Sequence, residues 1–269
     1  MKALRFALVG DPVAHSKSPL MHAAAFREMG LPHTYEAIRV TADELPAMIQ
    51  ALRDGTFAGL NVTVPHKLLA ARLADEARVF GTEAANTLVR ADDGRIVAHN
   101  TDVTALREEL GSLGSPGSGR ALVLGSGGAA RAAIAALEAL GVKDVAVRAR
   151  TPGPLVTQPW SPSPESEART RLVVQATTAG MKGGPPGEVA ADVVAWDALP
   201  ADAAALDVVY APPETPFLRA AARRGLMRRN GLGMLARQGA AALELWLGRP
   251  APLGAMLAAL ERAVDSKGR

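Results

Sequence analysis

The sequence predicts an α/β protein of two domains: an N-terminal α/β domain with a mostly parallel sheet, a Rossmann-type domain after it, and a cleft between them. Two observations predict this. Short apolar runs alternate with helical patterns in the first hundred residues, and strands separated by helices imply parallel pairing. Further on, an apolar run leads into a glycine loop and an alanine-rich helix, which is a βαβ unit. The 269 residues suffice for two ordinary domains.

The N-terminal hundred residues are expected to form strand 6–9, helix 19–29, strand 34–40, helix 42–53, strand 59–64, helix 68–76, and two strands, 86–90 and 95–99, around the turn Asp92-Asp93-Gly94. The first strand ends at Gly10. Ser18 and Pro19 suit the N-cap and the first position of the first helix. Pro65 cannot donate to a sheet ladder, so it ends the strand before it.

A patch rich in glycine, serine and proline, residues 111–119, marks a boundary or a surface connection. Beyond it we expect a strand at 121–124, a helix to about residue 140, strands at 142–148, 172–176 and 205–209, and helices at 234–247 and 253–264. Residues 151–165 are proline-rich and irregular. The strand and helix that follow the patch at 111–119 start the second domain.

The composition narrows the class of protein. With 48% apolar and 21% charged residues the chain is globular, and no apolar run is long enough to span a bilayer. Its N-terminal apolar segment is too short for a signal peptide. The lack of cysteine excludes disulfides and thiolate metal sites. A net charge of +3 with scattered arginines argues against nucleic-acid binding and suits anionic small molecules. We expect a cytoplasmic enzyme that needs no metal, and a homodimer is compatible with the sequence.

Residues 61–67 gather polar groups at a strand end. Side chains alternate along a strand, so Asn61 and Thr63 are expected on one face and Val62 and Val64 on the other. Lys67 follows at the start of a helix. Open α/β sheets bind ligands at such carboxyl ends of strands. The alternative is an edge strand with a solvated surface lysine.

The glycine loop fits a dinucleotide site. Gly125, Gly127 and Gly128, with Ala130 in the last small position, match the G-x-G-x-x-G/A fingerprint, and the loop lies between an apolar strand and a helix. An NAD site usually has an acid after the next strand. This chain has arginines and a hydroxyl there, which suit the 2′-phosphate of NADP, at Arg148, Arg150 and Thr151. The alternatives are a structural glycine turn and a solvated basic strand end.

Further polar groups lie at element ends. Ser16 and Ser18 precede the first helix and can bind a carboxylate with hydroxyls and backbone N–H groups, although capping alone would explain Ser18. Asp102, in the triplet 100–102, is either a plain helix N-cap or a functional carboxylate. Asn86 is similarly ambiguous.

Taken in order, these motifs resemble the NADP-dependent shikimate dehydrogenase family over nearly the whole chain. The motifs that carry the resemblance are Ser16-Lys17-Ser18-Pro19, residues 61–67, Asn86-Thr87, Asn100-Thr101-Asp102, Gly125-Ser126-Gly127-Gly128-Ala129, Asp207-Val208-Val209-Tyr210, Thr215-Pro216-Phe217-Leu218, Gly231-Leu232-Gly233-Met234-Leu235 and Gln238.

The resemblance implies reversible, NADPH-dependent reduction of 3-dehydroshikimate to shikimate, as in aromatic amino-acid (chorismate) biosynthesis. It implies that residues 1–102 form the substrate-binding domain, joined by C-terminal helices at about 236–269, and that residues 103–235 form the NADP-binding domain. It implies that Lys67 and Asp102 are the catalytic pair. The substrate would be bound by Ser16, Ser18, Asn61, Thr63, Asn86, Tyr210 and Gln238. The cofactor would be bound by Gly125, Ser126, Gly127, Gly128, Ala129, Arg148, Arg150, Thr151, Thr177, Val208, Gly231 and Met234. A protonated lysine can donate to the developing alkoxide, and it must lose that proton in the oxidative direction, so alkaline pH should favour oxidation.

Four features depart from the family pattern: Val103 after the triplet, Ala149 in Ala149-Arg150-Thr151, Gln175 in Gln175-Ala176-Thr177, and a short, proline-rich segment between Thr151 and Gln175, as though a helix there were lost. Three of them fall in the cofactor domain. Two alternatives therefore stay open. One is a quinate/shikimate dehydrogenase that uses NAD, and the other is a regulatory homologue that binds shikimate but has lost turnover.

Overall fold

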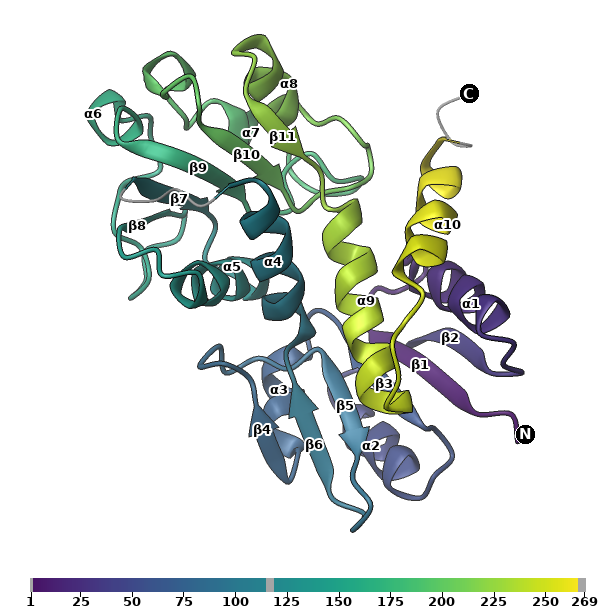
Figure 1. The fold of residues 1–269 in the computed structure, drawn as a ribbon. Helices are drawn as coiled ribbons and strands as arrows, with labels where there is room; N and C mark the ends of the chain where they lie inside the picture. The colour runs from purple at the N-terminus through teal and green to yellow at the C-terminus, as the bar shows by residue number, and fades with distance from the viewer. Residues whose placement is uncertain (1, 115–118, 266–269) are drawn as a thin grey trace. The chain divides into compact units, whose positions relative to one another are not determined.

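The computed structural model describes residues 2–114 and 119–265, which form two compact units (Figure 1). Unit 1 comprises Met1–Ala105 and Leu235–Arg269, and unit 2 comprises Leu106–Met234. These divisions lie close to the boundaries predicted at residues 102 and 235. The glycine-rich patch at 111–119 lies inside unit 2 and is not the boundary; its residues 115–118 are outside the described part.

The described residues of unit 1 form a six-stranded sheet in the order β2-β1-β3-β5-β6-β4. Its strands are β1 (Arg5–Gly10), β2 (Thr34–Arg39), β3 (Gly59–Val62), β4 (Glu76–Arg78), β5 (Thr87–Arg90) and β6 (Ile96–His99). β1 pairs in parallel with β2 and β3, and β4 pairs in parallel with β6. β5 is antiparallel to both of its neighbours, β3 and β6, and the tight turn at Gly94 joins it to β6 as a hairpin.

Helices cover both faces of this sheet. α2 (Leu45–Arg53) and α3 (Lys67–Leu73) pack on the face that receives Ala7 and Val9 of β1. The alternate residues of β1 face the other way, where Phe6 contacts α1 (Ser18–Glu28) and α9 (Leu232–Leu247) through Phe26 and Trp246. α10 (Leu253–Asp265) packs on α1.

The structure corrects three predictions in unit 1. β3 ends at Val62, so Val64 does not continue the alternation and is 59% exposed. The predicted helix 68–76 ends at Leu73, and the chain then forms β4, which pairs with β6. The N-cap of α1 is Lys17, and Ser18 is the first helical residue.

The described residues of unit 2 form a five-stranded parallel sheet in the order β11-β10-β9-β7-β8, as expected for a Rossmann-like domain. The strands are β7 (Arg120–Leu124), β8 (Val145–Arg148), β9 (Thr170–Gln175), β10 (Ala204–Asp207) and β11 (Met227–Arg229). The helices are α4 (Thr101–Ser112), α5 (Gly128–Ala139), α6 (Pro164–Glu167), α7 (Glu188–Ala191), the 3₁₀ helix η1 (Trp196–Ala198) and α8 (Pro216–Arg223). The chain enters unit 2 within α4 and leaves it within α9.

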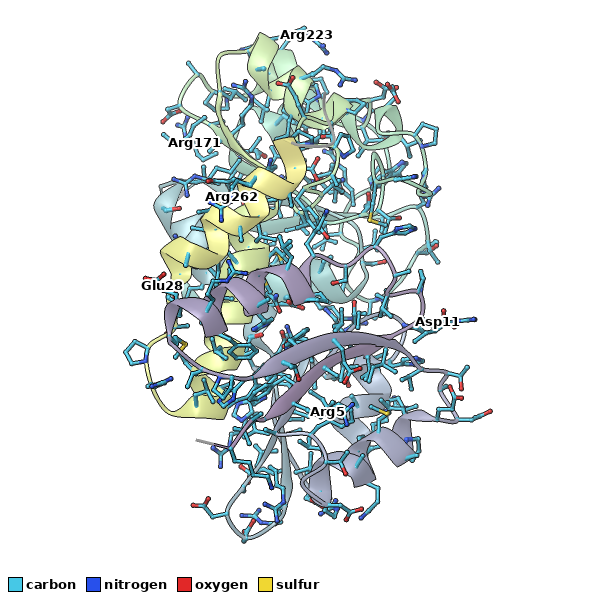
Figure 2. The ribbon with its side chains drawn as sticks, turned by 90° about the vertical axis from the view of Figure 1, so that its right-hand side faces the viewer. Arg5, Asp11, Glu28, Arg171, Arg223 and Arg262 are labelled. Carbon is cyan, nitrogen blue, oxygen red and sulfur yellow. The ribbon has the colours of Figure 1, made fainter. Side chains whose placement is uncertain are left out.

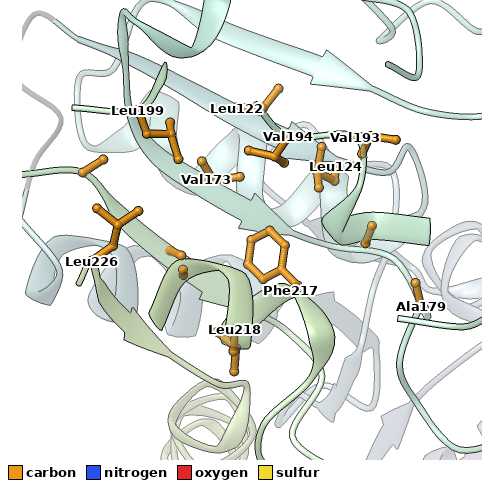
Figure 3. Close-up of a cluster of buried hydrophobic side chains, with 14 of the residues drawn as sticks. Leu122, Leu124, Val173, Ala179, Val193, Val194, Leu199, Phe217, Leu218 and Leu226 are labelled. Atoms are coloured by element: carbon orange, nitrogen blue, oxygen red, sulfur yellow. The ribbon is translucent and has the colours of Figure 1, made fainter. Parts of the chain in front are cut away.

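A buried cluster on one face of this sheet holds α7 and α8 in place. The cluster includes Phe217 and Leu218 of α8, Val173 of β9, and Leu122 and Leu124 of β7 (Figure 3). These side chains are at most 3% exposed. The sequence analysis did not predict α7, α8 or β11. It expected 151–165 to be irregular, and the segment forms only the four-residue α6 at its end.

Most charged side chains lie on the outside of the two units, and Arg148, Glu167 and Asp207 are fully buried exceptions. Figure 2 shows Arg5 of unit 1 and Arg171 and Arg223 of unit 2 at the surface. None of the helices in residues 2–114 and 119–265 is both long and apolar enough to cross a membrane.

Candidate functional site

A lysine–aspartate pair lies at the carboxyl ends of the unit 1 strands. Lys67 is the first residue of α3 and Asp102 is the second residue of α4. The Lys67 Nζ lies 2.6 Å from Asp102 Oδ2. The side chains are 19% and 9% exposed, so the ammonium reaches solvent while the carboxylate is largely shielded. A charge-assisted hydrogen bond of this length fixes the position of the ammonium.

Asn86 holds the carboxylate from the other side. Its Nδ2 donates to Asp102 Oδ1 at 2.8 Å, and its Oδ1 accepts from the Thr101 N–H at 2.7 Å. Asn100 Oδ1 accepts from the Asp102 N–H at 3.1 Å and so caps α4. Asn100, and not Asp102, is therefore the N-cap of α4. The carboxylate of Asp102 instead binds Lys67 through Oδ2 and Asn86 through Oδ1.

Tyr35 on β2 holds Asn61, a predicted substrate-binding residue. Its hydroxyl donates to Asn61 Oδ1 at 2.7 Å. Burial raises the pKa of Tyr35 well above its usual value, so the hydroxyl keeps its proton. Ser16 Oγ accepts from the Ser18 N–H at 3.1 Å.

Asn61 itself is only 4% exposed. Its Nδ2 donates both hydrogens to the protein, at the Asn86 carbonyl and at Thr87 Oγ1, each 3.0 Å away. Its contact with a ligand would therefore have to use the second lone pair of Oδ1. Asn61 therefore supports Asn86 and Thr87, and its predicted contact with a substrate stays a prediction.

The loop between β3 and α3 is fixed at both ends. Thr63 N–H donates to the Val9 carbonyl at 2.9 Å, and a Cβ on Gly10 would clash with the Thr63 methyl. His66 is 3% exposed, and its Nε2 lies 2.5 Å from the Val40 carbonyl. These contacts set where α3 begins, and therefore where Lys67 stands.

Gln238 and Tyr210 belong to different units. Gln238 lies on the part of α9 in unit 1, where its Nε2 donates to the Leu235 carbonyl at 2.8 Å. Tyr210 follows β10 in unit 2, and burial raises the pKa of its hydroxyl. Ser16, Ser18, Asn61, Thr63, Asn86, Lys67 and Asp102 all lie in unit 1.

The glycine loop of unit 2 fits a pyrophosphate. Gly125 has a φ of +115°, and a Cβ there would press on the Ala176 carbonyl. At Gly127 the space is open within 4 Å, and no side chain in the described residues caps the N-terminus of α5. Ser126, Gly127, Gly128 and Ala129 are at least partly accessible. The first N–H groups of α5 are thus presented to an anion, with the positive end of the helix dipole behind them.

Arg148 is not available to a 2′-phosphate, which corrects its predicted role. Its side chain is fully buried and forms an ion pair with Glu167 at 2.7 Å. Every guanidinium N–H is used, by Glu167, by Gln158 Oε1 and by the Val193 carbonyl. The cation anchors the irregular segment after β8. Arg150 and Thr151, by contrast, are exposed.

The remaining predicted cofactor residues follow β9 and β10. Gln175 Oε1 accepts from the Thr177 N–H at 2.5 Å, so the longer side chain closes this loop although it departs from the family pattern. Gly231 packs against Val208, since a Cβ on Gly231 would clash with the Val208 carbonyl. Met234 is half-buried at the start of α9.

Sequence reasoning missed several residues that build the site. Tyr35 and His66 act through buried hydrogen bonds across 26 positions in each case, which no local pattern reveals. Asn100 was noticed within its triplet, and an Asx residue directly before a helical pattern is the signal that could have identified it as the cap.

Comparisons with known proteins point to one family. Residues 8–88 match a model described as the shikimate dehydrogenase substrate binding domain, and residues 231–261 match the shikimate 5′-dehydrogenase C-terminal domain. A protein of Methylobacterium radiotolerans, "Shikimate dehydrogenase (NADP(+))", is 43% identical over 261 residues, covering 90% of each chain.

Two solved structures illustrate the similarity. Shikimate 5-dehydrogenase from Thermus thermophilus, in complex with NADP(H) and shikimate, has a TM-score of 0.84 at 37% identity and covers 97% of this chain and 99% of its own. The ligand-free 5-ketofructose reductase of a Gluconobacter strain has a TM-score of 0.86 at 27% identity, with the same coverage of 97% and 99%.

Proposed function

The chain belongs to the shikimate dehydrogenase family, and on that premise we propose that it catalyses the reversible reduction of 3-dehydroshikimate to shikimate with NADPH. The observation that carries the proposal is the pair of Lys67 and Asp102, 2.6 Å apart and held by Asn86. This arrangement supplies a fixed cation and proton donor, which ketone reduction requires.

Bound NADPH supplies the hydride that reduces the ketone carbon. Lys67 Nζ donates a proton to the ketone oxygen and stabilises the negative charge that develops there. Asp102 orients this ammonium through Oδ2, while Asn86 fixes Oδ1, so the donor needs little reorganisation during the reaction. In the reverse direction Lys67 accepts the proton of the substrate hydroxyl. Since oxidation releases a proton, alkaline pH favours shikimate oxidation.

We assign the substrate carboxylate to Ser16 and Ser18, at the N-terminus of α1. The first N–H groups of α5, at Gly127 and Gly128, would hold the pyrophosphate of the cofactor. Arg150 and Thr151, which are exposed, would contact the 2′-phosphate. Thr177, Val208, Gly231 and Met234 would complete the cofactor site, and Thr63, Tyr210 and Gln238 the substrate site.

An assay with purified protein tests the proposal. Shikimate is mixed with NADP⁺ or NAD⁺, and absorbance is followed at the reduced-nicotinamide band; quinate and 5-ketofructose (the latter with NADPH) serve as comparison substrates. We expect turnover of shikimate with NADP⁺ above all other combinations. Binding of shikimate without turnover with either cofactor would instead favour the regulatory homologue. Faster turnover with NAD⁺ and quinate would favour the quinate/shikimate enzyme.

Two of these alternatives have less support. The Methylobacterium relative carries NADP(+) in its name and the Thermus structure contains NADP(H), which argues against a preference for NAD. The Lys67–Asp102 pair is intact, and a protein that only binds shikimate has no chemical need for both groups. The cytoplasmic location and the homodimer stay predictions; light scattering after size-exclusion chromatography measures the latter.

A further inference from the structure

We propose that Asp207 is a positioning residue that holds two loops of unit 2, residues 175–180 and 207–215, in the form that binds the cofactor. The inference rests on the proposed function, because these loops carry Thr177, Val208 and Tyr210, to which cofactor and substrate contacts are assigned. Asp207 itself touches neither ligand in this proposal and acts through its hydrogen-bond partners.

The carboxylate of Asp207 joins three segments of chain. Asp207 is the last residue of β10, and its side chain is fully buried. Its Oδ1 accepts from the Val209 N–H at 2.9 Å and from Gln175 Nε2 at 3.2 Å. Its Oδ2 accepts from the Thr215 hydroxyl at 2.5 Å. One side chain therefore ties the end of β9, the turn after β10 and the start of α8.

Gln175 carries this connection into the first loop. Its Oε1 accepts from the Thr177 N–H, and its Nε2 also donates to the Ala179 carbonyl at 3.0 Å. If Asp207 releases Nε2, the Gln175 amide loses one of its three hydrogen bonds and keeps only those with the Ala179 carbonyl and the Thr177 N–H. The position of Thr177 then depends on Asp207.

Thr215 and Val209 carry the connection into the second loop. The Thr215 oxygen accepts from the Leu218 N–H at 3.3 Å and caps α8, so it fixes where this loop ends. The Val209 N–H, held by Asp207, fixes where it begins. Gly231 donates its N–H to the Val209 carbonyl at 3.2 Å, which aligns the start of α9 with the same loop.

The ionised carboxylate suits these partners, because the Val209 and Gln175 N–H groups and the Thr215 O–H all donate to it. Among the described residues, no lysine, arginine or histidine side chain hydrogen-bonds to Asp207. The arginines of the neighbouring elements have other partners. Ion pairs join Arg171 to Asp202, Arg228 to Glu214, and Arg229 to Glu109, and Arg219 donates to the Glu214 carbonyl. Arg223 lies at the surface (Figure 2). Burial raises the pKa of Asp207 to about 6, against the hydrogen bonds from Thr215 and Val209, which lower it.

A buried carboxylate without a cation costs free energy, and Glu167 in the same unit avoids that cost by pairing with Arg148. The charge of Asp207 therefore does not stabilise the folded unit by itself. Its carboxylate does accept hydrogen bonds from three donors. Protonation obliges the carboxyl to donate, and Thr215 is the one partner able to accept. The hydroxyl hydrogen must then turn away from Oδ2, so a neutral hydrogen bond replaces the charge-assisted one and the hold on the second loop weakens.

The test compares four variants with wild type by the Kd for NADP⁺, measured by calorimetry between pH 5.5 and 8. Asp207→Asn imitates the protonated carboxyl, Asp207→Ala removes all three contacts, Thr215→Val removes one, and Thr215→Ser retains it. Asp144→Asn, in a surface ion pair of the same unit, is the matched control. We expect Asp207→Ala to raise Kd about tenfold or more, Asp207→Asn and Thr215→Val to raise it several-fold at pH 8, and the other two to match wild type.

The pH profile separates positioning from a general loss of structure. The wild-type Kd should rise as pH falls through about 6, and Asp207→Asn should lack the part of that rise due to Asp207. The 2′-phosphate of NADP⁺ also titrates near this pH, but it contributes equally to both proteins and cancels in the difference. Folded Asp207→Ala with a wild-type Kd and profile would overturn the proposal. If Asp207→Ala fails to fold, wild-type Kd values in both Asp207→Asn and Thr215→Val would overturn it.

A wild-type protein that binds no NADP⁺ would refute the proposed function instead. Hydrogen exchange at residues 175–180 and 207–215 then still decides the structural claim. Faster exchange in Asp207→Asn at pH 8 supports positioning, and unchanged exchange overturns it.

Discussion

Lys67 and Asp102 lie 35 positions apart in the chain, and buried amides bring them together. Thr87 and Thr101 orient the Asn86 side chain by donating to its Oδ1, and Asn86 Nδ2 in turn positions the Asp102 carboxylate. The lysine is therefore aimed by a network whose other members are shielded from water. Hydrogen bonds in such a shielded network are stronger than in water, and they hold one geometry.

Replacing Lys67 by alanine should lower kcat by about 10²–10⁴-fold, the usual contribution of a general acid, while the KM for shikimate changes little. Steady-state kinetics in both directions measures this. Lys143→Ala, an exposed lysine of unit 2, is the control and should leave kcat unchanged. A Lys67→Ala enzyme with near-normal kcat would exclude Lys67 from the chemistry.

Mutations of Arg148, the last residue of β8, and of Arg150 should have different effects. Arg150→Ala should raise the Kd for NADP⁺ more than that for NAD⁺, because only NADP⁺ has the 2′-phosphate, and it should leave stability unchanged. Arg148→Ala leaves Glu167 buried without its cation and should destabilise unit 2 by about 3–5 kcal/mol. Cofactor titrations and urea unfolding distinguish the two effects. Equal loss of both cofactors in Arg150→Ala would show that this residue does not contact the 2′-phosphate.

At the scale of elements, side-chain size decides how closely helices approach the sheet of unit 1. Trp246 of α9 lies flat enough on β3 that a Cβ on Gly59 would clash with its indole ring, and its Nε1 donates to the Leu88 carbonyl at 3.0 Å. The indole is rigid and hydrogen-bonded, so it cannot move aside easily. Glycine at this position is what allows α9 to cover the sheet.

Gly59→Ala should therefore destabilise the protein by about 1–3 kcal/mol, as overpacking does in other cores. Gly254→Ala is the matched control: it lies in α10, a Cβ there meets open space, and its φ is not positive, so alanine should be neutral or slightly stabilising. Urea unfolding monitored by circular dichroism compares them. Similar stabilities of the two variants would show that α9 can shift away from β3.

At the scale of the whole molecule, acid should affect the two units in opposite directions. Burial lowers the pKa of His22 in unit 1 from 6.5 to about 3. The unfolded chain takes up this proton first, so unit 1 loses stability as pH falls below about 6.5. Burial also lowers the pKa values of His33 and His99 in unit 1. Asp207 in unit 2 has a pKa raised from 3.8 to about 6, so folded unit 2 takes up its proton first and gains stability as pH falls below 6.

Between about pH 7 and 5, unit 1 should thus lose stability relative to unit 2. Tryptophan fluorescence in urea reports each unit separately, with Trp246 in unit 1 and Trp160 and Trp196 in unit 2, in variants that retain one reporter. His22→Phe preserves a ring against Tyr35, stacked 4.1 Å away, and should remove most of the acid sensitivity of unit 1. A unit 1 whose midpoint is independent of pH over this range would contradict the prediction.

Much of the fold followed from local patterns. The apolar strands, the helix after the glycine loop and the two C-terminal helices lie where periodicity placed them, because burial of one face imposes that periodicity. The elements α7, β11 and β4 are only three or four residues long, which is too short for a hydrophobic periodicity to predict them. β4 forms because β6 offers a free edge to pair with, and neither residues 76–78 nor their neighbours encode that edge.

The sequence by itself determined the family, the glycine loop and the polar residues that gather at strand ends, since each of these depends on residue type and spacing along the chain. Only the tertiary structure decided which polar groups contact one another. In the folded protein Arg148 is buried against Glu167, Asn100 rather than Asp102 caps α4, and Asp207 connects two loops. The physical reason is that a buried hydrogen bond joins residues by distance in space, and burial decides whether a charged side chain meets a ligand or its own protein.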